Sequence, residues 1–170
     1  MLSKKQRLSQ YGITSDMQVL AGIQLICDIF SADSNRNAKL LLERTARHES
    51  KLGNYQDLSK EYGEGIFQID LDTFNWIMDR LQEYNYLETR KLFHKHFGFP
   101  LNTLEYQDLR RIANTSIFLC RMRYRFVPDA IPADSTAQYK YYKKWWNGNG
   151  AATLEKWNDD TQDCFFEDRD

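Results

Sequence analysis

Glu49 is the residue of this sequence whose position best suits proton-transfer chemistry. It follows Ala38, Leu41, Leu42, Thr45 and Ala46 at steps of three and four residues, which places it on the apolar face of a predicted helix. This helix is expected to begin near Ser34 and to end at Gly53, so that Glu49 lies in its last turn. Burial and the negative end of the helix dipole both raise the pKa of such a carboxyl group. A carboxyl group that stays protonated near neutral pH can serve as the general acid of a glycosidase.

A simpler interpretation of Glu49 is a side chain whose stem packs while its carboxylate reaches water, and the pattern by itself favours it. The other face of the same helix carries Arg44, Arg47, His48 and Lys51, and is expected to face solvent. Replacing Glu43 by glutamine is accordingly expected to be nearly silent.

The order of the motifs after Glu49 supports the chemical interpretation. Glu49-Ser50 is followed by a loop, by Gly65-Ile66-Phe67-Gln68-Ile69 and then by a further predicted helix. This order resembles soluble lytic transglycosylases and goose-type lysozymes, in which a Glu-Ser pair ending a helix precedes a Gly-x-x-Gln segment. The resemblance implies that Glu49 is the catalytic acid and that the Gln68 segment lines a sugar groove. Asp70 matches an acidic position of the goose-type enzymes.

Further stretches extend the resemblance over residues 38–157. These families share a Tyr-Asn-x-Gly segment, and a similar segment here is Trp146-Asn147-Gly148-Asn149-Gly150. Trp146 takes the place of the tyrosine, which puts any positioning role of that tyrosine in doubt. Muralytic proteins of bacteriophages are similar at residues 49–55, 65–70, 121–124, 142–147 and 150–153. The resemblance therefore implies a phage-type member of the lysozyme superfamily.

Several residues are expected to contact the sugar. Gln68 offers one acceptor and two donors, which suit an acetamido group, although a hydrogen bond that fixes the loop is an equal alternative. Gly65 would let the backbone approach a ligand closely. Tyr139, Tyr142 and Trp146 share one helix face and Tyr141 and Trp145 another; one of these faces could stack on sugar rings. The expected substrate-binding residues are Ser50, Gly65, Phe67, Gln68, Tyr142, Trp146 and Asn147.

The elements that would position these residues form a string of helices. Expected helices cover about 16–30, 34–53, 73–84, 87–97, 104–125 and 135–147, with a short one after Thr153. The intervening residues 54–70 are expected to form a loop or a small β-ribbon. The predicted fold is a mainly α, lysozyme-like single domain (α+β with a minimal β-ribbon) over residues 1–158. Residues 159–170 form an acidic tail that is expected to be solvated.

Composition limits the other functions. The formal net charge of −1 argues against binding to nucleic acid or to an anionic membrane, despite basic residues among the aromatic residues of 139–146. Neither a secretory signal nor an apolar run of membrane-spanning length is recognised. Three scattered cysteines predict free thiols, and His94 and His96, two residues apart, do not suggest a metal pair. We expect no cofactor, no metal and a monomer.

The function predicted from these features is cleavage of peptidoglycan glycan strands between N-acetylmuramic acid and N-acetylglucosamine. A lytic transglycosylase needs no second carboxylate, whereas a lysozyme-type hydrolase would use Asp70, Asp57 or Glu64. Because none of these is placed as firmly as Glu49, the transglycosylase is favoured. The alternatives are a non-catalytic phage structural protein with the same fold and a helical nucleic-acid binder. The enzyme is expected to be made in the bacterial cytoplasm and to reach the cell wall through a holin or within the virion.

Overall fold

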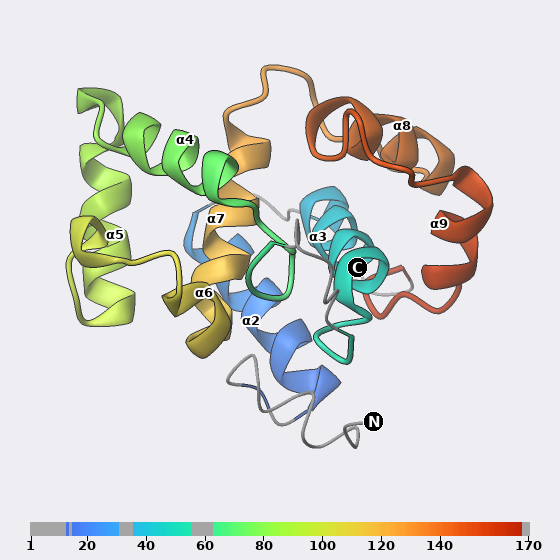
Figure 1. The fold of residues 1–170 in the computed structure, drawn as a ribbon, viewed down its shortest axis with the longest axis horizontal. Helices are drawn as coiled ribbons and strands as arrows, with labels where there is room; N and C mark the ends of the chain where they lie inside the picture. The colour runs from blue at the N-terminus through green and yellow to red at the C-terminus, as the bar shows by residue number, and fades with distance from the viewer. Residues whose placement is uncertain (1–12, 14, 31–35, 56–62, 168–170) are drawn as a thin grey trace.

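The computed structural model describes residues 13, 15–30, 36–55 and 63–167. These residues form eight α-helices and two short 3₁₀ helices (Figure 1): α2 (Asp16–Ile29), α3 (Arg36–Ser50), α4 (Leu71–Leu81), η1 (Tyr84–Tyr86), α5 (Leu87–Phe97), η2 (Leu101–Thr103), α6 (Asp108–Arg111), α7 (Ala113–Arg125), α8 (Ser135–Trp145) and α9 (Leu154–Asp160). The expectation of a mainly α-helical single domain is confirmed.

Helix α7 is the centre of the fold. Nearly all of its side chains are buried, among them Phe118, Leu119 and Met122, and it contacts α2, α3, α4 and α6. Helix α3 packs in turn on α2, α8 and α9. Figure 1 shows α4 and α5 on one side of α7, and α3, α8 and α9 on the other. The candidate site therefore depends on contacts between segments far apart in the sequence.

Local capping signals predicted several helix ends correctly. The Ser15 side chain accepts a hydrogen bond from the Gln18 amide at the start of α2, and the Thr153 side chain accepts one from Lys156 at the start of α9. Ser34, the expected cap of α3, lies outside the described residues. Helix α5 spans the expected residues 87–97.

The predicted helix over 104–125 is wrong. Ile112 adopts an extended conformation (φ −121°, ψ 91°) and divides the segment into α6 and α7. The Thr115 amide and hydroxyl both donate to the Ile112 carbonyl, at 2.9 and 2.6 Å, so that a new helix begins there. The segment contains no glycine or proline at this point, and the break therefore has no signal in the local sequence.

The minimal β-ribbon is reduced to a single antiparallel bridge between Glu64 and Ile69. The two residues exchange backbone hydrogen bonds of 2.8 and 3.0 Å, and the described parts of the chain contain no strand. Gly65 and Gln68, between them, have positive φ values of 73° and 49°, so that the chain turns back after four residues.

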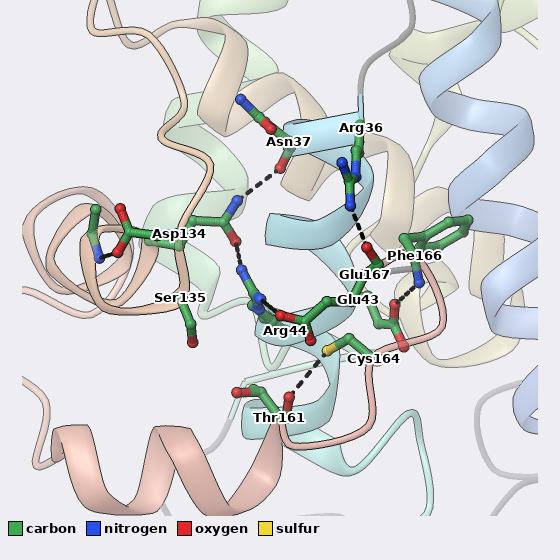
Figure 2. A network of polar contacts seen from close by, with 12 residues as sticks. Arg36, Asn37, Glu43, Arg44, Asp134, Ser135, Thr161, Cys164, Phe166 and Glu167 are labelled. Atoms are coloured by element: carbon green, nitrogen blue, oxygen red, sulfur yellow. Dashed lines mark hydrogen bonds and ion pairs between the residues drawn. The ribbon is translucent and has the colours of Figure 1, made fainter. Parts of the chain in front are cut away.

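The expectation of a solvated acidic tail is wrong for residues 159–167. Cys164 and Phe166 are buried, and the amides of Phe165 and Phe166 donate to the two carboxylate oxygens of Glu43 at 2.7 and 2.9 Å. Arg44 donates to Gln138 of α8 and to Glu167, each at 3.0 Å. Figure 2 shows Arg44 beside the C-terminal segment that carries Glu167. Because this segment covers α3, Glu43 and Arg44 are buried, although Arg44 was expected on a solvent-exposed face.

The apolar face of α2 differs from the one that the sequence predicts, which consists of Met17, Leu20, Leu25, Ile26, Ile29 and Phe30. Leu20, Ile26 and Phe30 are buried as expected, but Met17 and Leu25 are 55% and 46% exposed. Val19, Ile23 and Cys27 occupy the buried positions instead.

Three further findings concern the whole described chain. All three cysteines are free and buried. None of the helices within the described ranges combines the length and the apolar character needed to cross a membrane. No group of three or more His, Cys, Asp or Glu residues that could hold a metal ion occurs among the residues placed by the structure.

Candidate active site

An open cleft of about 540 Å³ brings together the end of α3, the turn at 63–68, α8 and the start of α9. Its lining residues are His48, Glu49, Tyr55, Gly63, Gln68, Tyr142, Asn147, Ala151, Ala152 and Lys156. Four of these residues, Glu49, Gln68, Tyr142 and Asn147, are sequence-predicted site residues. They come from three separate parts of the chain, so the fold gathers them in one place.

The end of α3 fixes the position of Glu49. Lys51, Leu52 and Gly53 have left-handed backbone conformations, with φ values of 51°, 57° and 83°. The Leu52 amide donates to the Ala46 carbonyl at 3.1 Å, and the Gly53 amide donates to the Ser50 hydroxyl at 2.8 Å. These bonds satisfy groups that a helix end leaves without partners. Two consecutive non-glycine residues with positive φ are a strained arrangement, of the kind found near functional sites.

The environment of the Glu49 carboxyl group changes its proton affinity. Burial raises its pKa from 4.5 to about 7, against the opposing influence of hydrogen bonds from Tyr142 and Trp146 and of the positive charge of Lys156. The side chain is partly buried and still faces the cleft. Near neutral pH it can therefore hold a proton or release one, which is the property required of a general acid and base.

Tyr142 provides the contact that holds this carboxyl group. Its hydroxyl donates to Oε1 of Glu49 at 2.7 Å. Burial and the charge of Glu49 raise the pKa of the Tyr142 hydroxyl, which therefore stays protonated as a donor. The sequence has tryptophan where the resembling families have a tyrosine, at Trp146. A tyrosine one helical turn earlier thus supplies a hydroxyl to the acid, and Trp146 adds a second hydrogen bond.

Gln68 fixes the turn and also reaches the cleft. Its Nε2 donates to the Gly65 carbonyl at 2.8 Å, which fixes the turn, and its side chain also lines the cleft. The turn is tightly packed, because a Cβ atom on Gly63 would lie 2.0 Å from the Gln68 carbonyl oxygen. Asn147 is held in a similar way, since its Oδ1 accepts from Lys143 at 3.1 Å.

Four of the predicted substrate-binding residues do not line the cleft. Ser50, Gly65 and Phe67 are buried behind it, so the expected direct contact with sugar is not met for them. Ser50 completes the end of α3, and Phe67 packs edge-on against Trp146 with 6.3 Å between ring centroids. Gly65 is required by packing, because a Cβ there would lie 2.7 Å from the Leu109 carbonyl oxygen. Trp146 lies beside Glu49 without being a lining residue.

The expected second acids are engaged elsewhere. Asp70 is exposed and caps α4, accepting from the Thr73 amide at 2.7 Å and from the Thr73 hydroxyl at 3.1 Å. Glu64 accepts two hydrogen bonds from Arg110, at 2.8 and 2.6 Å. Asp57 lies outside the described residues. Among the cleft residues that the structure describes, only Glu49 carries a carboxyl group.

Sequence reasoning missed His48 and Lys156. His48 was assigned to the solvent-facing side of α3, but its Nδ1 lies 2.9 Å from an Asp160 carboxylate oxygen and its ring meets Tyr142 edge-on. Burial lowers the pKa of His48, and the charge of Asp160 opposes this shift. Lys156 forms no ion pair with any described carboxylate, and nothing in the sequence distinguishes it from other surface lysines.

Comparison of the chain with protein-family models, with curated proteins and with solved structures gave no match.

Proposed function

We propose that this protein is a lysozyme-like enzyme that cleaves the glycan strands of bacterial peptidoglycan between N-acetylmuramic acid and N-acetylglucosamine. The observation that carries the proposal is a single carboxyl group, Glu49, whose pKa is raised to about 7 in an open cleft and whose Oε1 accepts a hydrogen bond from Tyr142. A carboxyl group poised in this way is the general acid of glycosidic bond cleavage.

In the proposed reaction Glu49 transfers its proton to the glycosidic oxygen as the bond from that oxygen to C1 of the muramyl residue breaks. The hydroxyl of Tyr142 stabilises the carboxylate that this step leaves behind, because a hydrogen bond to the charged form favours it. The carboxylate then accepts the proton of the C6 hydroxyl while O6 bonds to C1. The products are a 1,6-anhydromuramyl end and a free sugar hydroxyl, with no net uptake of water.

The distribution of acids favours this transglycosylase reaction over hydrolysis. Glycoside hydrolases generally use two carboxyl groups facing the scissile bond. The described cleft residues supply only Glu49, while Asp70 caps α4 and Glu64 is paired with Arg110. The transglycosylase reaction uses one carboxyl group first as acid and then as base, so Glu49 is sufficient for it.

Other cleft residues suit this substrate class. Gln68 and Asn147 line the cleft, and side-chain amides are of the type that hydrogen-bonds an acetamido group. Lys156, which pairs with none of the described carboxylates, brings a positive charge that suits the carboxylates of muramyl residues and their peptides.

The test is mass spectrometry of the products released from purified sacculi in ¹⁸O-labelled water. We expect anhydromuramyl ends without label from the wild-type protein, and none from a folded Glu49→Gln variant. Reducing muramyl ends that carry ¹⁸O would make the protein a lysozyme-type hydrolase. A folded wild-type protein that releases nothing would favour the second candidate, a non-catalytic phage structural protein.

A further inference from the structure

A cluster of two arginines and two aromatic rings lies where α4 meets the C-terminal end of α7. The guanidinium carbon of Arg123 lies 4.3 Å from the ring centroid of Trp76. The guanidinium carbon of Arg80 lies 5.6 Å from the same ring and 5.0 Å from that of Phe126. We call Trp76, Arg80, Arg123 and Phe126 the arginine platform. None of these residues lines the Glu49 cleft.

The positive charges of the arginine platform are in direct contact with no carboxylate of the part of the chain that the structure describes. Elsewhere Arg44, Arg47 and Arg110 each pair with a glutamate, whereas Arg80 and Arg123 form no ion pair with the carboxylates that the structure describes. Asp70 influences Arg123 electrostatically, but its two oxygens accept from Thr73.

The platform is also partly removed from water. Arg80 and Arg123 are both partly buried, and the buried Nε of Arg80 has no hydrogen-bond partner. Burial and the nearby charge of Arg80 lower the pKa of Arg123. Two partly desolvated charges of the same sign are unfavourable together unless an anion is added.

We infer that the arginine platform binds an oxyanion, a carboxylate or a phosphate group, between Arg80 and Arg123. Guanidinium groups present planar sets of donors that match the oxygens of both anions. Trp76 is 40% exposed, so that a flat part of the ligand next to the anionic group can rest on its ring. This site is independent of the proposed cleavage reaction, and its test does not use activity.

The experiment is a ¹H–¹⁵N NMR titration of the indole N–H of Trp76, assigned with a Trp76→Phe variant, at constant ionic strength set with chloride. Inorganic phosphate is the first probe and acetate the second, so that the two arms distinguish phosphate from carboxylate. We expect the Trp76 signal to shift and to saturate with at least one probe. Arg80→Gln and Arg123→Gln should each weaken this binding by at least about tenfold, because a charge-assisted hydrogen bond is lost.

Lys144→Gln is the matched control, because Lys144 Nζ also lies 4.3 Å from an aromatic ring, that of Trp145, but pairs with Asp129 at 3.0 Å. This variant should bind the probe like the wild-type protein. A Trp76 signal in the wild-type protein that does not saturate with either probe would overturn the inference, and this measurement does not require the arginine variants to fold. Equal binding by folded Arg80→Gln and Arg123→Gln variants would overturn it as well.

Discussion

Two glutamates six residues apart on α3, Glu43 and Glu49, have opposite environments. The carboxylate of Glu43 is fully buried and accepts hydrogen bonds from two backbone amides of the C-terminal segment and from Arg47. Glu49 faces an open cleft, and among the described residues Tyr142 and Trp146 donate hydrogen bonds to it. Glu43 joins the C-terminal segment to the helix, as Figure 2 shows, whereas Glu49 is accessible from the cleft.

The comparison shows that the number of donors, rather than burial alone, separates a structural carboxylate from a chemically poised one. Several hydrogen bonds and a positive partner hold a carboxylate in its charged form, whereas burial with few donors favours the protonated form. The same substitution at both positions should therefore have opposite consequences for activity and stability.

The largest expected effect is the loss of activity in Glu49→Gln. Glutamine keeps the size and polarity of the side chain but has no proton to transfer, so that cleavage of glycan strands should fall by at least about 100-fold. Turnover of purified sacculi measures this change.

The stability of Glu49→Gln should rise although its activity falls. A raised pKa in the folded state means that the wild-type protein loses stability as pH rises from about 4.5 through about 7. The glutamine variant lacks this loss and should be more stable above pH 7, by on the order of 1–3 kcal/mol. Equal slopes of stability against pH in both proteins would contradict the account of Glu49.

Glu43→Gln should instead affect stability. The NH2 of the glutamine would point a hydrogen-bond donor at a backbone N–H, which is itself a donor, and the negative charge opposite Arg47 would be lost. We expect the free energy of unfolding to fall by about 1–3 kcal/mol. Denaturant unfolding measures the cost, and the rate per folded molecule should stay close to that of the wild-type protein. This prediction replaces the expectation of a nearly silent change.

A smaller effect is expected for Tyr142→Phe. Removing the donor at 2.7 Å leaves the Glu49 carboxylate less stabilised, so its pKa should rise further. The cleavage rate should fall by about tenfold, the equivalent of one hydrogen bond, and the decline of kcat/KM at high pH should move to higher pH. A decline that moves to lower pH would show that Tyr142 does not favour the carboxylate.

Asp70→Asn is expected to have the smallest effect. Asparagine also caps helices, so stability should change by less than about 1 kcal/mol, and Asp70→Ala should cost about 0.5–2 kcal/mol. Neither variant should reduce kcat if Glu49 acts alone. A loss of kcat in Asp70→Asn approaching that of Glu49→Gln would assign Asp70 to catalysis and favour hydrolysis.

The sequence predicted the parts of this account that depend on local periodicity. Residue spacing predicts the apolar neighbours of Glu49, the left-handed Gly53 that follows α3 by three residues, and the starts of α2 and α9. The signal for the Asp70 cap, an acid before a helix whose third residue is Thr73, was also present, but the resemblance to goose-type enzymes favoured a catalytic interpretation.

Features that depend on tertiary packing could not be predicted in this way. The exposure of Glu43 and Arg44 is decided by residues 161–167, which are more than a hundred positions away in the sequence. The extended Ile112 that ends α6 has no local sequence signal. The pairing of Tyr142 with Glu49 likewise requires α8 to cross α3, which periodicity does not specify.

The most direct test of the central claim is the pH dependence of kcat/KM for cleavage of purified peptidoglycan glycan strands by the wild-type protein. If the protonated Glu49 starts the reaction, kcat/KM should decline above about pH 7, the value to which burial raises the pKa of this group. Cleavage whose kcat/KM is unchanged up to pH 9, or declines already above about pH 4.5, the ordinary pKa of a glutamate, would contradict the role assigned to Glu49.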